Sequence, residues 1–270
     1  MRHLRVARAR SMRLLRGRIG GLTPARNRYG VTMWPDWSDK TFAYCHYGTY
    51  GRYLSDLLAS IDRPFCFLDI GANQGLFSLV AGKNPHCRSI VALEPVQRTH
   101  DKLAANLTLN DLDPKASRIR AALSDRDGEC QITLRDAHSG MATLGSHLSD
   151  VRDCRHSETV RLITMRTLDE YLPSDLPIFA KIDVEGHEPV VLQQLLRSSH
   201  RSNILAMFYE MDERWADAGA VAAMLADAGF ETSRKYGRGV HYDVLATRND
   251  AAGGLADIGD QELLYAVPAE

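Results

Sequence analysis

Several features are missing from this chain, and each absence narrows what it can be. No apolar run approaches the roughly 18 residues of a membrane-spanning helix, so no spanning segment is expected. The five cysteines include no Cys-x-x-Cys pair, which argues against a zinc site of that kind and fits a reducing, cytoplasmic location. The chain also lacks a complete Gly-x-Gly-x-x-Gly fingerprint. What remains, 44% hydrophobic and 25% charged residues, is the composition of an ordinary folded domain.

Acidic residues are absent from the first 28 positions, which hold nine arginines. The rest of the chain therefore carries a net charge of −10. This asymmetry predicts a basic N-terminal arm over residues 1–28 and a single domain over 29–270. The arm could be a solvated extension, a transit peptide, or a basic helix in peripheral contact with an anionic membrane. The acidic body argues against a nucleic-acid partner, because a domain that binds nucleic acid carries positive charge on its fold.

From residue 65 onward, short apolar strands alternate with segments of helical spacing, which is typical of an α/β fold. The strands are expected at 65–70, 89–93, 118–123, 177–182, 203–209, 231–236, 242–247 and 263–267. The helices are expected at 76–82, 96–110, 189–196 and 218–228. This order predicts a mostly parallel sheet with helices on both faces and a C-terminal antiparallel hairpin.

Two segments do not follow the alternation. Residues 29–62 are predicted to form an N-terminal cover, with an irregular, aromatic-rich part at 29–50 and a helix at 53–61. Residues 136–158, rich in Ser, His, Gly and Asp, are predicted to form an inserted loop between strands at 130–134 and 159–165. A connection of this length in a compact domain often has a functional role.

A glycine loop follows the first strand and opens a helix: Asp69-Ile70-Gly71-Ala72-Asn73-Gln74-Gly75. In an open parallel sheet, ligands bind beyond the carboxyl ends of the strands, where glycine lets the backbone approach them. If Gly71 begins a dinucleotide fingerprint, Asn73 and Leu76 occupy the other two glycine positions. The loop therefore favours a cofactor without a pyrophosphate.

Glu94 ends the next expected strand, 25 residues after Asp69. A carboxylate at that position can accept hydrogen bonds from both hydroxyls of a ribose. The structural alternative is that Glu94 only caps the helix that follows. The strand-end position followed by Pro95 favours ribose binding.

Taken together, five motifs resemble the FkbM family of methyltransferases over roughly residues 45–250. They are Phe67–Gly75, Glu94-Pro95, Ala122–Asp125 with Gly128, Thr167–Asp169, and Lys181–Glu188. The resemblance implies a class I methyltransferase fold, which is Rossmann-like, with S-adenosylmethionine as the methyl donor and usually O-methylation.

The resemblance also implies which residues hold the cofactor. The methionine part would lie at Asp69, Gly71, Asn73 and Gly75, the ribose at Glu94, and the adenine near Ala122, Leu123 and Ser124. Asp183, at the end of a later strand, is assigned to cofactor binding as well as to catalysis.

Methyl transfer to oxygen needs a positioned acceptor and a group that removes its proton. His187 is the expected general base because the pKa of histidine lies near neutral pH. Asp183 is the second candidate, and Glu210, which ends the next strand, is expected to point to the same edge. The acceptor is expected to be a hydroxyl of a sugar, glycan or other small molecule.

Three other interpretations remain open. Asp183, Glu185, His187 and Glu210 could bind Mg or Mn if an extended backbone places 183, 185 and 187 on one side, although we predict no metal. The chain could instead be an NAD-dependent oxidoreductase or a non-catalytic cofactor-binding protein of the same fold. The incomplete fingerprint argues against the oxidoreductase, and the acids with His187 at strand ends argue mildly against the non-catalytic protein.

Overall fold

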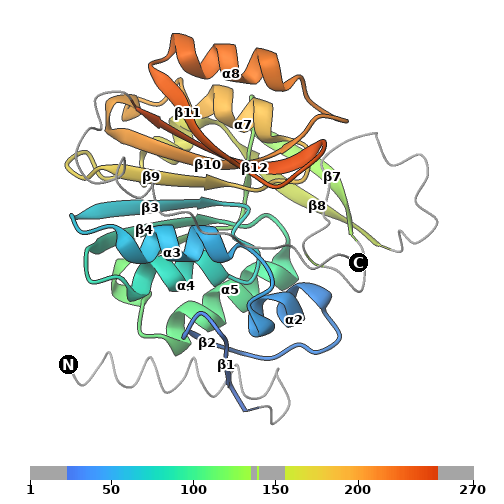
Figure 1. Ribbon diagram of the computed structural model, residues 1–270. Helices are drawn as coiled ribbons and strands as arrows, with labels where there is room; N and C mark the ends of the chain where they lie inside the picture. The colour runs from blue at the N-terminus through green and yellow to red at the C-terminus, as the bar shows by residue number, and fades with distance from the viewer. Residues whose placement is uncertain (1–22, 135–138, 140–155, 249–270) are drawn as a thin grey trace.

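The computed structural model describes residues 23–134, 139 and 156–248. Its centre is a seven-stranded sheet in the order β11-β12-β10-β9-β3-β4-β5 (Figure 1). The strands are β3 (Phe65–Ile70), β4 (Cys87–Leu93), β5 (Ala116–Ile119), β9 (Ile178–Ile182), β10 (Ile204–Asp212), β11 (Phe230–Tyr236) and β12 (His241–Arg248). The first five of these run parallel, whereas β12 is antiparallel to both β10 and β11. The predicted parallel sheet with its C-terminal hairpin is confirmed.

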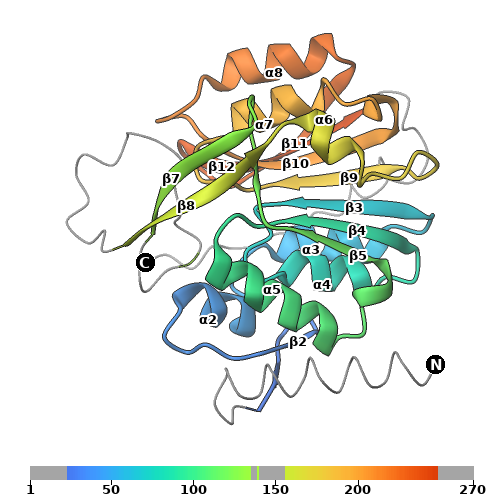
Figure 2. The same ribbon diagram turned by 180° about the vertical axis from the view of Figure 1, so that it is seen from behind.

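Helices cover both faces of this sheet, as Figures 1 and 2 show from opposite sides. One face carries α3 (Arg52–Ser60), α4 (Leu76–Lys83) and α5 (Gln97–Leu109), and its core includes Phe67, Phe179 and Phe208. The other face carries α6 (Met165–Asp169), α7 (Glu188–Leu195) and α8 (Ala218–Asp227) over a second core. Because side chains alternate along each strand, Phe67 and Asp69 share the first face while Leu68 and Ile70 pack into the second.

The sheet reverses its strand order between β3 and β9, which lie side by side at its centre. The chain moves from β3 outward to β4 and β5, and then returns to β9 and moves outward on the other side to β10. Loops that leave the carboxyl ends of β3 and β9 diverge at this point, which is where doubly wound sheets bind ligands. The glycine loop and Asp183 therefore meet at the expected position.

The predicted strand over 118–123 is wrong in its extent. β5 ends at Ile119, and after a break at Arg120 and Ala121 the strand β6 (Ala122–Leu123) joins a separate sheet. That sheet has the order β6-β8-β7, with β7 at Gly128–Leu134 and β8 at His156–Ile163. The expected strand to residue 165 also ends early, because α6 begins at Met165.

The N-terminal cover contains a helix that was not predicted. The aromatic-rich segment forms α2 (Lys40–Tyr47), where the Asp39 side chain accepts a hydrogen bond from the backbone of Thr41 and Gly48 ends the helix in the left-handed conformation. Short strands β1 (Ala25–Arg26) and β2 (Thr32–Met33) precede it. Phe42 and Met33 are fully buried in the core over α3 and α4, so this segment packs on the sheet domain.

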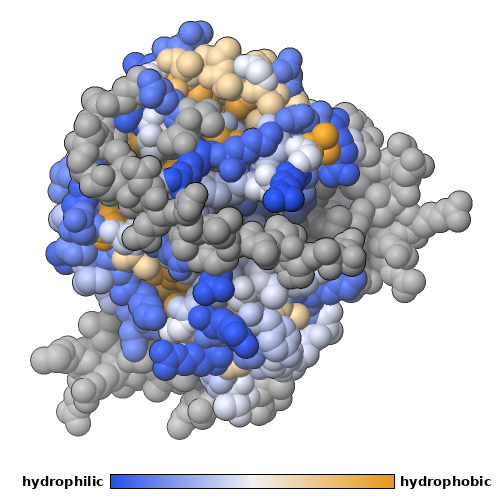
Figure 3. Space-filling model, in the orientation of Figure 1, coloured by the Kyte–Doolittle hydropathy of each residue, from blue (hydrophilic) through white to orange (hydrophobic). Residues whose placement is uncertain are grey.

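Other expectations fall partly or wholly outside the described residues. These are most of the basic arm (1–22), most of the inserted loop (135–138 and 140–155) and the strand at 263–267. The last residues of the predicted loop, 156–158, belong to β8. Within the described ranges, none of the helices has the length and hydrophobicity that crossing a membrane requires. The face seen in Figure 3 is largely hydrophilic, with a paler apolar area over α8 at its top.

Candidate active site at the carboxyl ends of the strands

The glycine loop turns sharply between β3 and α4. Gly71, Asn73 and Gly75 have φ values of 78°, 50° and 91°, in the left-handed region that glycine and asparagine tolerate best. The position of Gly71 also excludes any side chain, because a Cβ atom there would lie 1.9 Å from the carbonyl oxygen of Asp183. This close approach holds the loop against the segment that follows β9.

Asp69 lies beneath the loop rather than on its surface. Its carboxylate is fully buried, accepts a hydrogen bond from Ser78 Oγ at 2.6 Å, and lies 3.5 Å from Lys181 Nζ. Lys181 Nζ also donates to the carbonyl oxygen of Gly71 at 2.7 Å. Burial lowers the pKa of Lys181, but Asp183 and Asp69 outweigh it and raise this pKa above the ordinary value. Asp69 and Lys181 therefore hold the glycine loop in position.

Glu94 caps the helix that follows it, while its binding of a ribose stays a prediction. Its Oε2 accepts a bond from the backbone N–H of Asn73 at 3.0 Å, and its Oε1 accepts one from Val96, the N-cap residue of α5, at 2.9 Å. Burial raises the pKa of Glu94 to about 7. Each oxygen keeps further acceptor capacity for a ribose hydroxyl. The residue therefore ties the loop to α5 whether or not a ribose is bound.

His187 does not lie with the other expected catalytic residues. It is the N-cap residue of α7, and its Nε2 is 3.3 Å from Ser124 Oγ, just past β6. Burial lowers its pKa, with Asp125 opposing. The structure therefore brings His187 beside the Ala122–Ser124 segment assigned to the adenine.

The alternation expected for 183, 185 and 187 is broken by two left-handed residues. Glu185 has φ 54° and Gly186 has φ 99°, so the segment turns instead of extending. Glu188 stabilises that turn, since its carboxylate accepts bonds from the backbone N–H groups of Val184 and Gly186, both at 2.9 Å. Burial raises the pKa of Glu188 to about 7.

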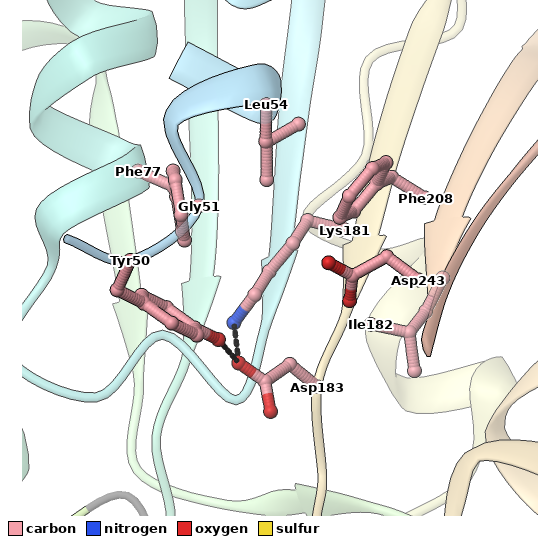
Figure 4. Close-up of a pocket in the computed structure, with 9 residues that line it drawn as sticks. All are labelled: Tyr50, Gly51, Leu54, Phe77, Lys181, Ile182, Asp183, Phe208 and Asp243. Atoms are coloured by element: carbon pink, nitrogen blue, oxygen red, sulfur yellow. Dashed lines mark hydrogen bonds and ion pairs between the residues drawn. The ribbon is translucent and has the colours of Figure 1, made fainter. Parts of the chain in front are cut away.

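Asp183 has one occupied and one open carboxylate oxygen. Its Oδ2 accepts a hydrogen bond from the Tyr50 hydroxyl at 2.7 Å and lies 3.2 Å from Lys181 Nζ. Figure 4 shows both interactions on one oxygen while the other oxygen points away from them. None of the described residues donates a hydrogen bond to that second oxygen, Oδ1.

Acidic side chains continue from Asp183 across the same face of the sheet. Phe208 pairs with Lys181 in register, and two residues further on Glu210 pairs with Asp243 of β12. Period-two alternation therefore puts Lys181, Asp183, Phe208, Glu210 and Asp243 on one face. Burial, followed by the charges of Asp183 and Glu210, raises the pKa of Asp243 to about 7.

Two further groups complete this acidic face. His241 Nε2 lies 2.6 Å from Glu210 Oε1. Burial and then the neighbouring carboxylates Asp183, Glu210 and Glu188 raise the pKa of Glu185 to about 9.

Among the described residues, no group of three or more His, Cys, Asp and Glu side chains has the arrangement of a metal site.

A pocket opens on this face between β9, β10, β12 and the first turns of α3 and α4 (Figure 4). It is lined by Tyr50, Gly51, Leu54, Phe77, Lys181, Ile182, Asp183, Phe208 and Asp243. Tyr50 belongs to an aromatic cluster that the sequence offered as a possible lining of an acceptor pocket, whereas no role was predicted for two other polar groups, Lys181 and Asp243. One signal was present for Lys181, because a lone lysine in the apolar strand Ile178–Ile182 needs buried partners. Asp243 had none, since its place depends on the pairing of β12 with β10.

Comparison with known proteins agrees with this geometry. The Methyltransferase FkbM domain matches residues 69–232, which include the glycine loop, Glu94 and Asp183–Glu188. The methyltransferase sdnD of Sordaria araneosa is 28% identical over 199 residues, covering 63% of this chain and 75% of the relative. The expected activity class and its cofactor, S-adenosylmethionine, are confirmed.

Solved structures with a similar fold were also found. One is a putative tRNA (m1A22) methyltransferase of Streptococcus pneumoniae in complex with S-adenosyl-L-methionine, with 11% identity, a TM-score of 0.45, and coverage of 73% of this chain and 72% of that one. Another is aTrm5 in complex with tRNALeu, with 14% identity, a TM-score of 0.44, and coverage of 84% and 53%. The exclusion of a nucleic-acid partner is corrected by these matches, because proteins described as acting on or binding tRNA are among them. The net charge of the chain was too coarse a criterion for excluding a nucleic-acid partner.

The site residues fit S-adenosylmethionine in their chemistry. The cofactor presents a sulfonium, an ammonium and ribose hydroxyls, and the loop and strand ends present acceptors: the carboxylates of Glu94 and Asp183 and the carbonyl oxygens of the loop. Gln74 Oε1 is a buried acceptor in this loop to which no described group donates. The loop lacks the second and third glycines of the dinucleotide fingerprint, which would let the backbone approach a pyrophosphate.

Proposed function

Because the chain belongs to the FkbM family of methyltransferases, we propose that it transfers a methyl group from S-adenosylmethionine to a hydroxyl oxygen of a small molecule or sugar. The observation that carries this proposal is the carboxylate of Asp183. It stands at the carboxyl end of β9, against the glycine loop, and turns one unoccupied oxygen away from its partners beside a pocket.

Asp183 would act as the general base in this reaction. S-adenosylmethionine, when bound, supplies a methyl group on a positively charged sulfur. Oδ1 of Asp183 would take the proton of the acceptor hydroxyl, whose oxygen would receive the methyl group, with S-adenosylhomocysteine as the second product. Tyr50 and Lys181 hold the other oxygen, Oδ2, and so fix the direction of Oδ1. Such orientation is what proton transfer in a transition state requires.

The remaining expected site residues receive supporting roles in this proposal. Gly71, Asn73 and Gly75 shape the loop for the methionine part, and Asp69 holds it through Lys181. Glu94 would accept bonds from the ribose, and Ala122 and Leu123 would lie beside the adenine.

His187 would act at that adenine side, and Glu210 would act on the acceptor side with His241.

Methyl transfer from isotopically labelled S-adenosylmethionine tests the proposal. The acceptor panel should hold sugars, glycans, hydroxylated small metabolites, lipids and tRNA, because charge does not exclude RNA. We expect label on a small hydroxylated compound in a linkage that survives alkali, as an ether does. Label on nitrogen or in an alkali-labile ester would overturn O-methylation of a hydroxyl, and label on RNA alone would overturn the small-molecule or sugar acceptor; each would leave the methyltransferase class intact.

A further inference from the structure

The pocket beside Asp183 has an unusual combination of walls. Three aromatic rings line it, those of Tyr50, Phe77 and Phe208, together with the carboxylates of Asp183 and Asp243. Tyr50 is 40% exposed, so the pocket opens to solvent beside this ring. In Figure 4 the Asp243 carboxylate points into the space between Lys181 and Phe208.

The basic side chains near this pocket already contact carboxylates other than Asp243. Lys181 contacts the fully buried Asp69 and also Asp183, at 3.5 Å and 3.2 Å. His241 contacts Glu210 at 2.6 Å. None of the described residues donates a hydrogen bond to Asp243. This carboxylate therefore lacks the close cationic partner that Asp183 and Glu210 have.

A carboxylate withdrawn from water without a partner is costly, and a ligand can remove that cost by supplying the missing charge. An ammonium group does so and is also attracted to the faces of aromatic rings. A neutral hydroxyl offers one hydrogen bond but no charge, while an anionic group would be repelled by Asp183, Glu210 and Asp243. The walls of the pocket therefore match a primary ammonium better than either alternative.

We propose that this pocket binds a protonated amine of the acceptor, so that the substrate of this methyltransferase is an amino alcohol or amino sugar whose hydroxyl lies at Asp183. The proposal rests on the function proposed above and specifies its substrate class. Asp243 is the residue that distinguishes the amine, with Phe208 and Tyr50 as the ring walls.

Three probes with one skeleton test the charge preference directly: 2-aminoethanol, ethane-1,2-diol and hydroxyacetate. Their binding to the full chain, saturated with S-adenosylhomocysteine, is measured by ligand-observed NMR titration at neutral pH. We expect saturable binding of 2-aminoethanol at least about tenfold tighter than that of ethane-1,2-diol, and no binding of hydroxyacetate. Glucosamine and glucose form a second pair in which the same preference is expected. Equal binding within the sets, or no saturable binding of the amines, overturns the proposal.

Variants locate the preference in the pocket. Asp243→Asn should reduce the amine preference about tenfold, whereas Glu210→Gln should reduce it less, because Glu210 already has His241 as its partner. Asp227→Asn, which removes one charge from the exposed side of α8, should leave it unchanged. Unfolding curves and S-adenosylhomocysteine affinity verify that each variant is folded. If Asp227→Asn lowers the preference as much as Asp243→Asn, the effect is one of net charge and the pocket assignment is wrong.

This experiment separates the substrate class from the reaction itself. Binding of the probes does not depend on turnover, so a methyltransferase with a neutral acceptor would fail the probe test and still methylate another compound. Conversely, a chain that binds the amines but places label only on nitrogen would retain the pocket and lose the O-methylation proposal.

Discussion

Asp183 engages one carboxylate oxygen with Tyr50 and Lys181 and leaves the other open beside the pocket. Replacement by asparagine keeps the size of the side chain and removes its ability to take a proton. We expect Asp183→Asn to lower the single-turnover rate at saturating cofactor by about 10²–10⁴-fold, as for the loss of a general base.

Two further single-residue variants serve as controls for Asp183→Asn. His187→Ala tests the histidine first expected as the base. It should lower the rate less than Asp183→Asn, because His187 contacts Ser124 rather than the acidic face. Asp62→Asn, exposed at the opposite end of β3, should not change the rate. Abolition of turnover by His187→Ala with near-normal turnover in Asp183→Asn would return the base role to the histidine.

Gly71 illustrates a second single-residue requirement. Gly71→Ala should lower the free energy of unfolding by more than about 1–3 kcal/mol, because alanine meets both a φ of 78° and an atom 1.9 Å from its Cβ. Gly186→Ala is the matched control: φ is 99° there, but no atom lies within 4 Å of the added Cβ. Urea unfolding measures both. Equal losses would mean that the contact with Asp183 does not matter.

At the scale of elements, β3 and β9 are joined by a pair of opposite charges as well as by their backbones. Asp69 and Lys181 are register partners, and Asp69 is fully buried. Lys181→Met should therefore destabilise the fold by about 3–5 kcal/mol, because it leaves a buried carboxylate without its cation. Lys181→Met combined with Asp69→Asn should recover part of that loss, whereas the exposed Lys40→Met should cost less than about 0.5 kcal/mol. Additive losses in the double variant would contradict this coupling.

Asp243, where β12 pairs with β10, should make the stability of the fold depend on pH. Burial and the charges of Asp183 and Glu210 raise the pKa of Asp243 from 3.8 to about 7, while His241 and Lys181 oppose them weakly. A carboxyl group with a raised folded-state pKa favours the fold below its unfolded pKa and loses that contribution as pH rises to the folded value. The contribution of Asp243 should therefore fall between about pH 4 and pH 7.

Urea unfolding at several pH values measures this contribution. The difference in stability between Asp243→Asn and the unaltered chain should shift in favour of the variant across that pH window. A difference that stays constant from pH 4 to pH 7 would mean that Asp243 keeps an ordinary pKa in the folded protein.

At the scale of the whole molecule, the cofactor should stabilise the fold because the loop, Glu94 and the end of β9 come together only in the folded state. A ligand at 100 times its dissociation constant adds about 2.7 kcal/mol. S-adenosylhomocysteine should thus raise the midpoint of thermal unfolding, while NAD at the same concentration should not. A shift with NAD alone would point to the oxidoreductase alternative.

Much of this molecule could be predicted from its sequence because the signals are local. Apolar runs at Phe65–Ile70 and Ile178–Ile182 predict buried strands, and glycines with Asn73 after the first of them predict a sharp loop. The missed α2 had local signals too, Asp39 before it and Gly48 after it, but its many aromatic residues concealed the helical pattern. The break after Ile119 separates two sheets and has no comparable local signal.

The sequence by itself determined the loop, the strand-end acids and their order along the chain, because glycine conformation and side-chain alternation are properties of neighbouring residues. Only the tertiary structure decided which of these groups meet. Left-handed Glu185 and Gly186 turn His187 away from Asp183, the register of β10 and β12 brings Asp243 opposite Glu210, and the N-terminal cover brings Tyr50 to Asp183. Such contacts join residues up to 133 positions apart, and they form only when buried surfaces pack and strands pair.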